Sequence, residues 1–229
     1  MWIKICGNTS LEDTRFAADS GAHAVGFVFA PSPRRVDAAT VRSITSQLPP
    51  QLEKYGVFVD AGFDEIVSIV DMCGLTGVQI HRSADELLPS RLRRHFAQSP
   101  DRIHILQVLH YKNQGFEQRL AGVCGDSAVD GVLVDSSTAR AVGGTGTSFN
   151  WLEARDTFLR AAPHLRLIAA GGLAPENVKQ AIQILRPWGV DVVSGVESAP
   201  GKKDPQRVLA FIRLAQEAAK EEALQAAET

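Results

Sequence analysis

The sequence predicts an α/β protein in which eight parallel strands close into a single-domain (β/α)8 barrel, the TIM-barrel architecture. Short apolar runs rich in Val, Ile and Phe alternate with longer segments of helical periodicity, which is typical of repeated βα units. The chain has 229 residues, of which 45% are hydrophobic. This length suits one barrel domain and leaves no room for a second.

Eight apolar runs are the candidate strands, and each is followed by a turn before the next helical segment. In chain order they are Trp2–Cys6, Ala24–Phe29, Tyr55–Val59, Gly77–His81, Ile103–Leu109, Gly131–Asp135, Leu165–Ala170 and Val190–Ser194. An open, doubly wound sheet is the alternative. A dinucleotide fold of that kind would carry a Gly-x-Gly-x-x-Gly turn after the first strand, and this chain has none there.

Helix starts are recognisable at two places. Thr9 or Ser10 is expected to cap the segment that begins at Leu11, because short hydroxyl side chains accept hydrogen bonds from the first free backbone N–H groups. Pro175 is expected at a first helical position, where its missing N–H costs nothing.

The tail after Phe211 is rich in Ala and Glu and is predicted to continue as a solvated helix. We therefore expect the catalytic barrel domain to span residues 1–212. Residues 213–229 are expected to extend the last barrel helix.

Charge and cysteine content limit the function classes. The net charge is −2, from 24 basic and 26 acidic side chains spread along the chain, so neither nucleic acid nor a membrane is an expected partner. Residues 1–5 do not follow the pattern of a secretion signal. The three cysteines, Cys6, Cys73 and Cys124, have neither metal-site spacing nor a disulfide pattern. We expect a cytoplasmic protein that acts on a small molecule.

Candidate functional residues follow the strands, because a barrel gathers its active groups at the carboxyl ends of the strands. Reading those positions gives Cys6, the loop around Arg34, Asp60, His81, Asp135, Gly171-Gly172 and Ser194-Gly195. The loops after the seventh and eighth strands are the usual barrel phosphate site, and their glycines let backbone N–H groups approach an anion. Turn geometry alone is the other explanation for these glycines. Two such loops in adjacent positions favour a phosphorylated substrate.

The residues at successive strand ends resemble the phosphoribosylanthranilate isomerase family of tryptophan biosynthesis. The resemblance is collinear from Lys4 to about Asp204. It rests on Lys4-Ile5-Cys6-Gly7, Gly26-Phe27-Val28-Phe29 with Ser32-Pro33-Arg34, Gly56-Val57-Phe58-Val59, Val78-Gln79-Ile80-His81, Gly143-Gly144-Thr145-Gly146 with Phe149 and Trp151, Gly171-Gly172-Leu173 with Pro175-Glu176-Asn177-Val178, and Val190-Asp191 through Ser194-Gly195-Val196-Glu197 with Pro200-Gly201-Lys202-Lys203-Asp204.

The resemblance implies an isomerase that performs an Amadori rearrangement on N-(5-phosphoribosyl)anthranilate without metal or organic cofactor, as a monomer or homodimer. It implies that Asp135 is the general acid at the furanose ring oxygen, that Cys6 is the base at the sugar C2, and that Arg34 holds the anthranilate carboxylate. Adjacent Arg35 is the other candidate for the carboxylate. Gly171, Gly172, Ser194 and Gly195 would bind phosphate.

Two further substrate contacts are expected. His81 ends the fourth predicted strand and either lines the mouth of the pocket or is a structural histidine. Gly144 belongs to a glycine-rich segment after Asp135, which either folds over the substrate or is simply a flexible connection. Asp60 is expected to be a helix cap or a loop residue.

The two catalytic roles make opposite demands on protonation. An ordinary Asp has a pKa of about 3.9 and an ordinary Cys one of about 8.5, so Asp135 must be helped to keep its proton and Cys6 to lose one. Strand alternation puts Lys4 on the same face as Cys6, roughly 7 Å below it. We expect Lys4 and Asp191 to form a buried pair there, with Lys4 adding positive potential at the thiol.

The chain departs from the family pattern at two positions, which bear on the shape of the pocket. Arg82 stands where Gly commonly follows the histidine, and Gln107 stands where Lys is common.

Three rival functions fit the sequence less well. The histidine-pathway isomerase performs the same rearrangement but carries a carboxylate where this chain has Cys6, and a metal-dependent epimerase needs clustered His and Asp ligands at the strand ends. A non-catalytic phosphometabolite-binding barrel would have no need of both Cys6 and Asp135.

Overall fold

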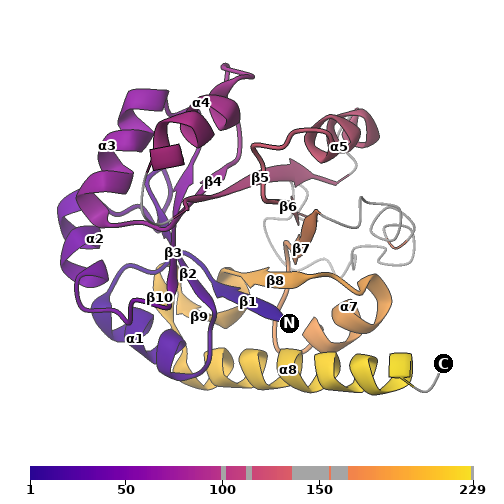
Figure 1. Ribbon diagram of the computed structural model, residues 1–229. Helices are drawn as coiled ribbons and strands as arrows, with labels where there is room; N and C mark the ends of the chain where they lie inside the picture. The colour runs from indigo at the N-terminus through magenta and orange to yellow at the C-terminus, as the bar shows by residue number, and fades with distance from the viewer. Residues whose placement is uncertain (99–101, 112–114, 136–154, 156–164, 228–229) are drawn as a thin grey trace.

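A closed barrel of eight parallel strands forms the centre of the molecule, as the computed structural model shows for residues 1–98, 102–111, 115–135, 155 and 165–227 (Figure 1). Each strand pairs with the next one along the chain, and β1 pairs with β8 to close the barrel. The strands are β1 Trp2–Ile5, β2 Ala24–Val28, β3 Glu53–Phe58, β4 Gly77–Ile80, β5 His104–His110, β6 Gly131–Asp135, β7 Arg166–Ala170 and β8 Gly189–Val192. The predicted fold class is confirmed.

Helices cover the outside of the barrel (Figure 1). They are α1 Leu11–Asp19, α2 Ala38–Thr45, α3 Phe63–Cys73, α4 Leu88–His95, α5 Phe116–Cys124, α7 Val178–Leu185 and α8 Pro205–Ala227. Two 3-10 turns, η1 Phe96–Gln98 and η2 Ser194–Val196, and a small ribbon, β9 Glu197–Ala199 with β10 Lys202–Lys203, complete the described elements. Ser10 caps α1 by accepting a hydrogen bond from the backbone of Asp13, which decides between the two expected caps.

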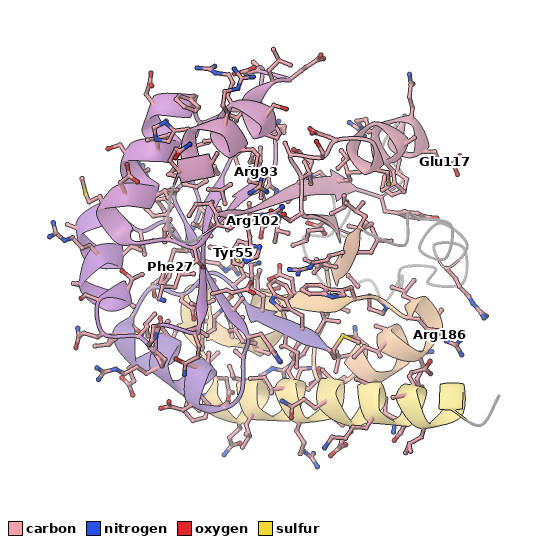
Figure 2. The ribbon with its side chains drawn as sticks, viewed as in Figure 1. Phe27, Tyr55, Arg93, Arg102, Glu117 and Arg186 are labelled. Carbon is pink, nitrogen blue, oxygen red and sulfur yellow. The ribbon has the colours of Figure 1, made fainter. Side chains whose placement is uncertain are left out.

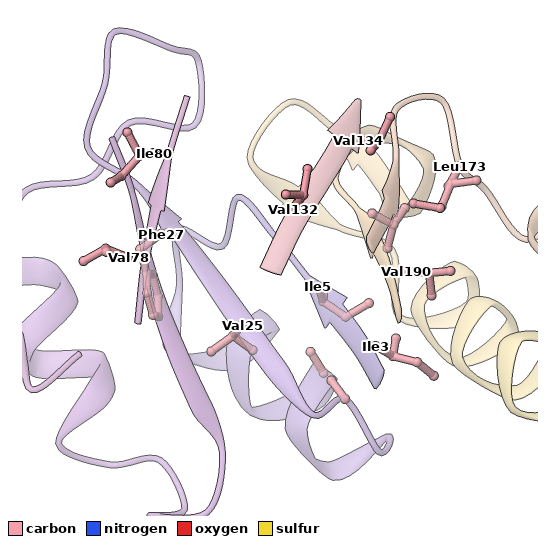
Figure 3. Packing of buried hydrophobic residues seen from close by; sticks show 14 of the residues in the cluster. Ile3, Ile5, Val25, Phe27, Val78, Ile80, Val132, Val134, Leu173 and Val190 are labelled. Atoms are coloured by element: carbon pink, nitrogen blue, oxygen red, sulfur yellow. The ribbon is translucent and has the colours of Figure 1, made fainter. Parts of the chain in front are cut away.

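Alternate side chains of each strand pack inward or outward. Ile3 and Ile5 of β1 point outward and lie beside Val25 and Val190 of the flanking strands, where the helices cover them (Figure 3). Each such side chain contributes roughly 1.5–3 kcal/mol when fully buried. A second, smaller cluster fills the barrel itself and consists of Trp2, Ala24, Tyr55, Leu106, Val108, Leu133, Ile168 and Ala170.

The side chains drawn on the ribbon show the same separation into an outer and an inner cluster. Phe27 of β2 belongs to the outer cluster, whereas Tyr55 of the neighbouring β3 belongs to the inner one (Figure 2). Glu117 on α5 and Arg186 after α7 lie at the outer edge of the molecule (Figure 2). Strand parity therefore decides which residues can reach the interior of the barrel.

Most element boundaries differ from the sequence prediction by one or two residues, and two of the differences have a clear cause in the backbone. β8 ends at Val192 and not at Ser194, because the backbone of Val193 leaves the extended region and Ser194 opens the 3-10 turn η2. α7 begins at Val178 and not at Pro175. Residues 175–177 form a turn that the Asn177 backbone (φ −130°, ψ −10°) separates from the helix proper.

The C-terminal helix α8 continues without interruption from Pro205 to Ala227, in line with the helix expected there (Figure 1). The expectation that this tail is solvated is wrong for its first part, because the helix packs against α7 and α1, and Ala215 and Ala218 are fully buried beyond the expected domain boundary. That boundary, at residue 212, stays a prediction. In the described part of the chain, no helix combines the length and apolarity that crossing a bilayer requires.

Candidate active site

A cavity of about 310 Å³ opens at the carboxyl ends of the strands. Most of the residues expected from the sequence line it, namely Cys6, Arg34, His81, Asp135, Gly171, Gly172 and Ser194. Gln79 and Asp191 join them. Gly195 does not line the cavity, and Gly144 lies outside the described residues.

A buried ion pair lies beneath Cys6. Lys4 and Asp191 are paired in register across the seam between β1 and β8, and the Lys4 Nζ donates to Asp191 Oδ1 over 2.5 Å. The Lys4 side chain is completely buried, and that of Asp191 is nearly so. The expected inward orientation of Lys4 and its pairing with Asp191 are therefore confirmed.

In the absence of a ligand, the surroundings of Cys6 favour the neutral thiol. Burial raises the pKa of Cys6, and this outweighs the opposite effects of Lys4 and Lys203. Burial also acts to lower the pKa of Lys4, but Asp191 and Cys6 prevail and raise it above its ordinary value. Lys4 thus adds positive potential at the thiol, as expected, without making it a thiolate on its own.

Gly26 makes room for the reactive sulfur. It lies on β2 beside Cys6, and a β-carbon at this position would collide with Cys6 Sγ. Sequence reasoning quoted Gly26 in a motif without assigning it a role. A glycine inside a strand often marks a close approach by another group, and this signal was available from the sequence.

Asp135 lies at the end of β6 with two histidines nearby. His110 is its register partner on β5, and its Nδ1 is 3.8 Å from Asp135 Oδ2. The His110 ring lies 6.0 Å from that of His81, centroid to centroid. Sequence reasoning did not single out His110, although its inward position at a strand end follows from the alternation of β5.

His81 is held as a neutral ring. Burial lowers its pKa to about 4, against the opposing effect of Asp135. Its Nε2 lies 3.1 Å from the Gln79 amide nitrogen. At neutral pH, the His81 ring therefore forms a polar but uncharged part of the cavity wall.

Arg34, and not Arg35, reaches the cavity. Arg35 is exposed, whereas Arg34 lines the cavity and directs its guanidinium at Glu197. Its Nε and Nη2 donate to the two Glu197 oxygens at 2.8 and 2.6 Å. Glu197 also contacts Lys203, its register partner in the ribbon. In the sequence both residues are only parts of a motif, because the pairing of Arg34 with Glu197 spans 163 residues and depends on the closed barrel.

The loops after β7 and β8 meet at the rim of the cavity. Gly171 and Gly172 have φ of +84° and +67°, which favour glycine. Gly195 packs so closely that a β-carbon there would clash with the Leu173 carbonyl oxygen. The two loops are therefore in direct contact, although Gly195 contributes to this contact and not to the cavity wall.

The departures from the family pattern lie away from the cavity. Arg82 forms an exposed ion pair with Asp60 at 2.7 Å, and Asp60 is a loop residue with φ +56°. Gln107 faces outward with its neighbours Ile105 and Leu109, and its amide donates to the Ile80 carbonyl at 3.2 Å.

Within the described ranges, no group of three or more His, Cys, Asp or Glu side chains is arranged to hold a metal ion.

The closed barrel and the thiol and carboxyl groups at its strand ends define a (β/α)8-barrel enzyme of the acid–base type. A family model described as "N-(5'phosphoribosyl)anthranilate (PRA) isomerase" matches residues 3–214. The chain belongs to this family.

Individual relatives agree with the family model. The N-(5'-phosphoribosyl)anthranilate isomerase of Prosthecochloris aestuarii is 40% identical over 223 residues, covering 94% of this chain and 95% of the relative. A crystal structure of a phosphoribosyl anthranilate isomerase in complex with reduced 1-(o-carboxyphenylamino)-1-deoxyribulose 5-phosphate superposes with a TM-score of 0.79 at 32% identity, covering 95% of this chain and 99% of that one. A structure of monomers generated from the dimeric enzyme of Thermotoga maritima gives a TM-score of 0.76 at 33% identity, again covering 95% and 99%.

Proposed function

We propose that this chain carries out the isomerase reaction of its family in tryptophan biosynthesis, with Cys6 as the base and Asp135 as the acid. The reaction is the Amadori rearrangement of N-(5-phosphoribosyl)anthranilate to its 1-deoxyribulose 5-phosphate isomer. One observation carries the assignment of roles: Cys6 and Asp135 line the same cavity as Arg34 and the glycine loop after β7.

The two groups divide the proton transfers between them. Asp135 gives a proton to the ring oxygen, the bond from C1 to that oxygen breaks, and the anthranilate nitrogen keeps its hydrogen and forms a protonated imine with C1. Cys6, as the thiolate, then removes the proton from C2 to give a neutral enolamine, which becomes the ketone by moving a proton from the C2 hydroxyl to C1. Transfer of the proton from Cys6 back to Asp135 restores both groups for the next turnover.

The remaining residues hold the substrate. We assign the phosphate to Gly171, Gly172 and Ser194 at the cavity, because backbone N–H groups in glycine-rich loops suit an anion, with Gly195 supporting them through the contact between the two loops. Arg34 holds the anthranilate carboxylate, for which its planar fork is well suited. His81 forms part of the cavity wall. Gly144, which lies outside the described residues, stays a predicted substrate contact.

The test is a turnover assay with freshly made phosphoribosylanthranilate, followed by the loss of its fluorescence. Cys6→Ser and Asp135→Asn should each reduce kcat by about a hundredfold or more, because general acid–base groups contribute factors of this order. Cys73→Ser and Asp60→Asn are matched controls at a cysteine and a strand-end aspartate away from the cavity, and they should keep wild-type kcat. A wild-type enzyme without turnover would contradict the function, and an active Cys6→Ser or Asp135→Asn variant would contradict that residue's role.

We propose a cytoplasmic enzyme that is monomeric or homodimeric. Its three cysteines are free thiols, which suits a reducing compartment. A relative from Thermotoga maritima is described as dimeric. Sedimentation equilibrium at several protein concentrations measures the mass directly. A trimer or larger assembly would contradict this proposal.

A further inference from the structure

The ribbon that follows β8 carries two buried charged side chains close to the cavity. Glu197 lies on β9 and Lys203 on β10, and their side chains are only 4% and 1% exposed. Buried charges are costly unless they are paired and hydrogen-bonded, so a burial of this kind needs a reason beyond stability. Neither residue lines the cavity, and the proton transfers proposed above use neither of them.

Lys203 donates hydrogen bonds to the backbone that follows β1 and β8. Its Nζ donates to the Cys6 carbonyl oxygen at 2.6 Å and to the Val193 carbonyl at 3.2 Å, and it forms an ion pair with Glu197 Oε1 at 3.2 Å. The Lys203 ammonium therefore joins the carboxyl ends of β1 and β8, and it holds the backbone of the residue that carries the thiol.

Glu197 fixes Arg34 by a side-on contact. The carboxylate accepts from Nε and Nη2 of Arg34, and this uses one edge of the guanidinium. In the part of the chain that the structure describes, no hydrogen bond reaches the opposite edge, formed by Nη1 and the second N–H of Nη2, so this edge can meet another planar anion. The Arg34 side chain is 21% exposed and lines the cavity, so a free edge is where a substrate carboxylate can meet it.

The charges of the three groups leave a net positive site. Arg34 and Lys203 each contribute +1 and Glu197 contributes −1, so the cluster carries +1. Without Lys203, Glu197 would cancel the charge of Arg34 and weaken its attraction for an anion. The contacts with Arg34 and Lys203 outweigh burial and lower the pKa of Glu197, which keeps it ionised at neutral pH.

The path of Arg34 to Glu197 is also shaped by the backbone. Gly7 has φ +74°, and a β-carbon there would lie 2.8 Å from Arg34 Cδ. The Arg34 side chain thus crosses directly over the residue after Cys6. The base, the arginine and the ribbon form one packed unit.

We propose that Glu197 and Lys203 are positioning residues, with Glu197 orienting Arg34 toward the substrate carboxylate and Lys203 holding the Cys6 backbone while preserving the positive charge of the site. This rests on the proposed function, and in particular on Arg34 as the group that binds the carboxylate.

The Glu197 arm compares two substrates. N-(5-phosphoribosyl)anthranilate carries the carboxylate, and N-(5-phosphoribosyl)aniline, made from aniline and ribose 5-phosphate, lacks it. Turnover of both is followed by chromatographic measurement of product. Glu197→Gln should raise KM for the anthranilate substrate by about tenfold or more, because small displacements of a positioning group have effects of this size. On the aniline substrate, the same variant should stay within about twofold of wild type.

A double-mutant cycle with Arg34→Ala completes this arm. If Glu197 acts through Arg34, Glu197→Gln should have almost no further effect once Arg34 is removed. Glu176→Gln, which changes an exposed partner of Arg207, is the matched control. Glu197→Asp keeps the charge but retracts it, and it replaces Glu197→Gln if that variant does not fold.

The Lys203 arm uses the pH profile of kcat/KM. Charged and titratable groups that act on Cys6 come from four elements or loops, and they are Lys4, Asp191, Lys203 and Arg34. Lys203 lowers the pKa of the thiol. Lys203→Met should therefore move the thiol limb of the profile to higher pH by about half to one unit, and Lys203→Arg should return it toward wild type. Lys202→Met, at the exposed neighbouring ribbon residue, should leave the limb in place.

The outcomes separate the two proposals. Wild type that turns over neither substrate contradicts the proposed function. If wild type is active, equal losses on both substrates, or an undiminished effect of Glu197→Gln in the Arg34→Ala background, would overturn the positioning role of Glu197. A thiol limb that Lys203→Met does not move, or that Lys203→Arg does not restore, would overturn the role of Lys203.

Discussion

Single residues in this barrel show how burial and charge act against each other. Lys4 lies beneath Cys6 and adds positive potential, yet the pKa of the thiol remains raised because the same interior removes it from water. The C2 proton can be removed only by the thiolate, so the thiol has to lose its proton before that step. Without substrate, Cys6 is a neutral thiol, which is less reactive than a permanent thiolate.

The Lys4–Asp191 pair gives a stability prediction. Lys4→Met should lower the free energy of unfolding by about 3–5 kcal/mol, because it leaves the Asp191 carboxylate buried without its partner. The double variant Lys4→Met with Asp191→Leu should recover most of this loss, since it removes both charges together. Urea unfolding followed by circular dichroism measures each value. Equal stability of the single and double variants would be incompatible with a buried ion pair.

His81 gives a prediction about pH. Its pKa is about 4 in the folded protein and 6.5 in a free side chain, so the unfolded chain binds more protons between these values. The stability that His81 contributes is present above pH 6.5 and is lost as the pH falls toward 4, by up to about 3 kcal/mol. Unfolding experiments from pH 4 to pH 7 should show this dependence in wild type and a weaker one in His81→Gln. Parallel curves for the two proteins would rule it out.

At the scale of elements, the alternation of strand residues accounts for most of what the sequence could predict. Cys6, His81 and Asp135 stand at strand ends with inward parity, and the cavity brings them together. His110 has the same properties and was overlooked. The contacts of Glu197 were beyond prediction, because its partner Arg34 is distant in sequence and only the closed barrel brings the two together.

Gly26 gives a prediction about contact between adjacent strands. Gly26→Ala should push the Cys6 thiol from its place, reduce kcat by about a hundredfold and lower stability by about 1–3 kcal/mol. Gly122→Ala on α5 is the matched control, because a β-carbon there meets nothing within 4 Å. It should leave kcat unchanged and stabilise the protein by about 0.5–1 kcal/mol. Steady-state kinetics and thermal unfolding distinguish the two, and wild-type kcat in Gly26→Ala would show that the thiol has free space.

At the scale of the whole molecule, the barrel closes where its first and last strands meet. β1 pairs with β8, and α8 packs on both α1 and α7. The order of the eight strands followed from sequence periodicity and length. The sequence did not predict how much of α8 the barrel needs, because an Ala-rich helix has the same pattern whether or not one of its faces is buried. The structure shows that the buried face continues to Ala218.

Truncation of α8 tests that limit. Removing residues 220–229 eliminates the exposed Lys179–Glu221 ion pair and the Arg186–Glu222 pair, and it should cost about 2 kcal/mol or less. Stopping after Ile212 also removes the buried Ala215 and Ala218 and uncovers the helices beneath them, so the loss should be several kcal/mol larger. The urea midpoint and m-value of each truncated protein give its loss of stability. Equal stability of the two truncations would instead support the domain boundary at residue 212.

The bond between Lys203 and the carbonyl of Cys6 has a consequence for protein synthesis. Cys6 leaves the ribosome 197 residues before Lys203. The nascent chain can form several βα units in that interval, but Cys6 cannot take up its working geometry until the chain has been synthesised through Lys203. A chain released before Lys203 therefore carries the cysteine without the contact that holds its backbone.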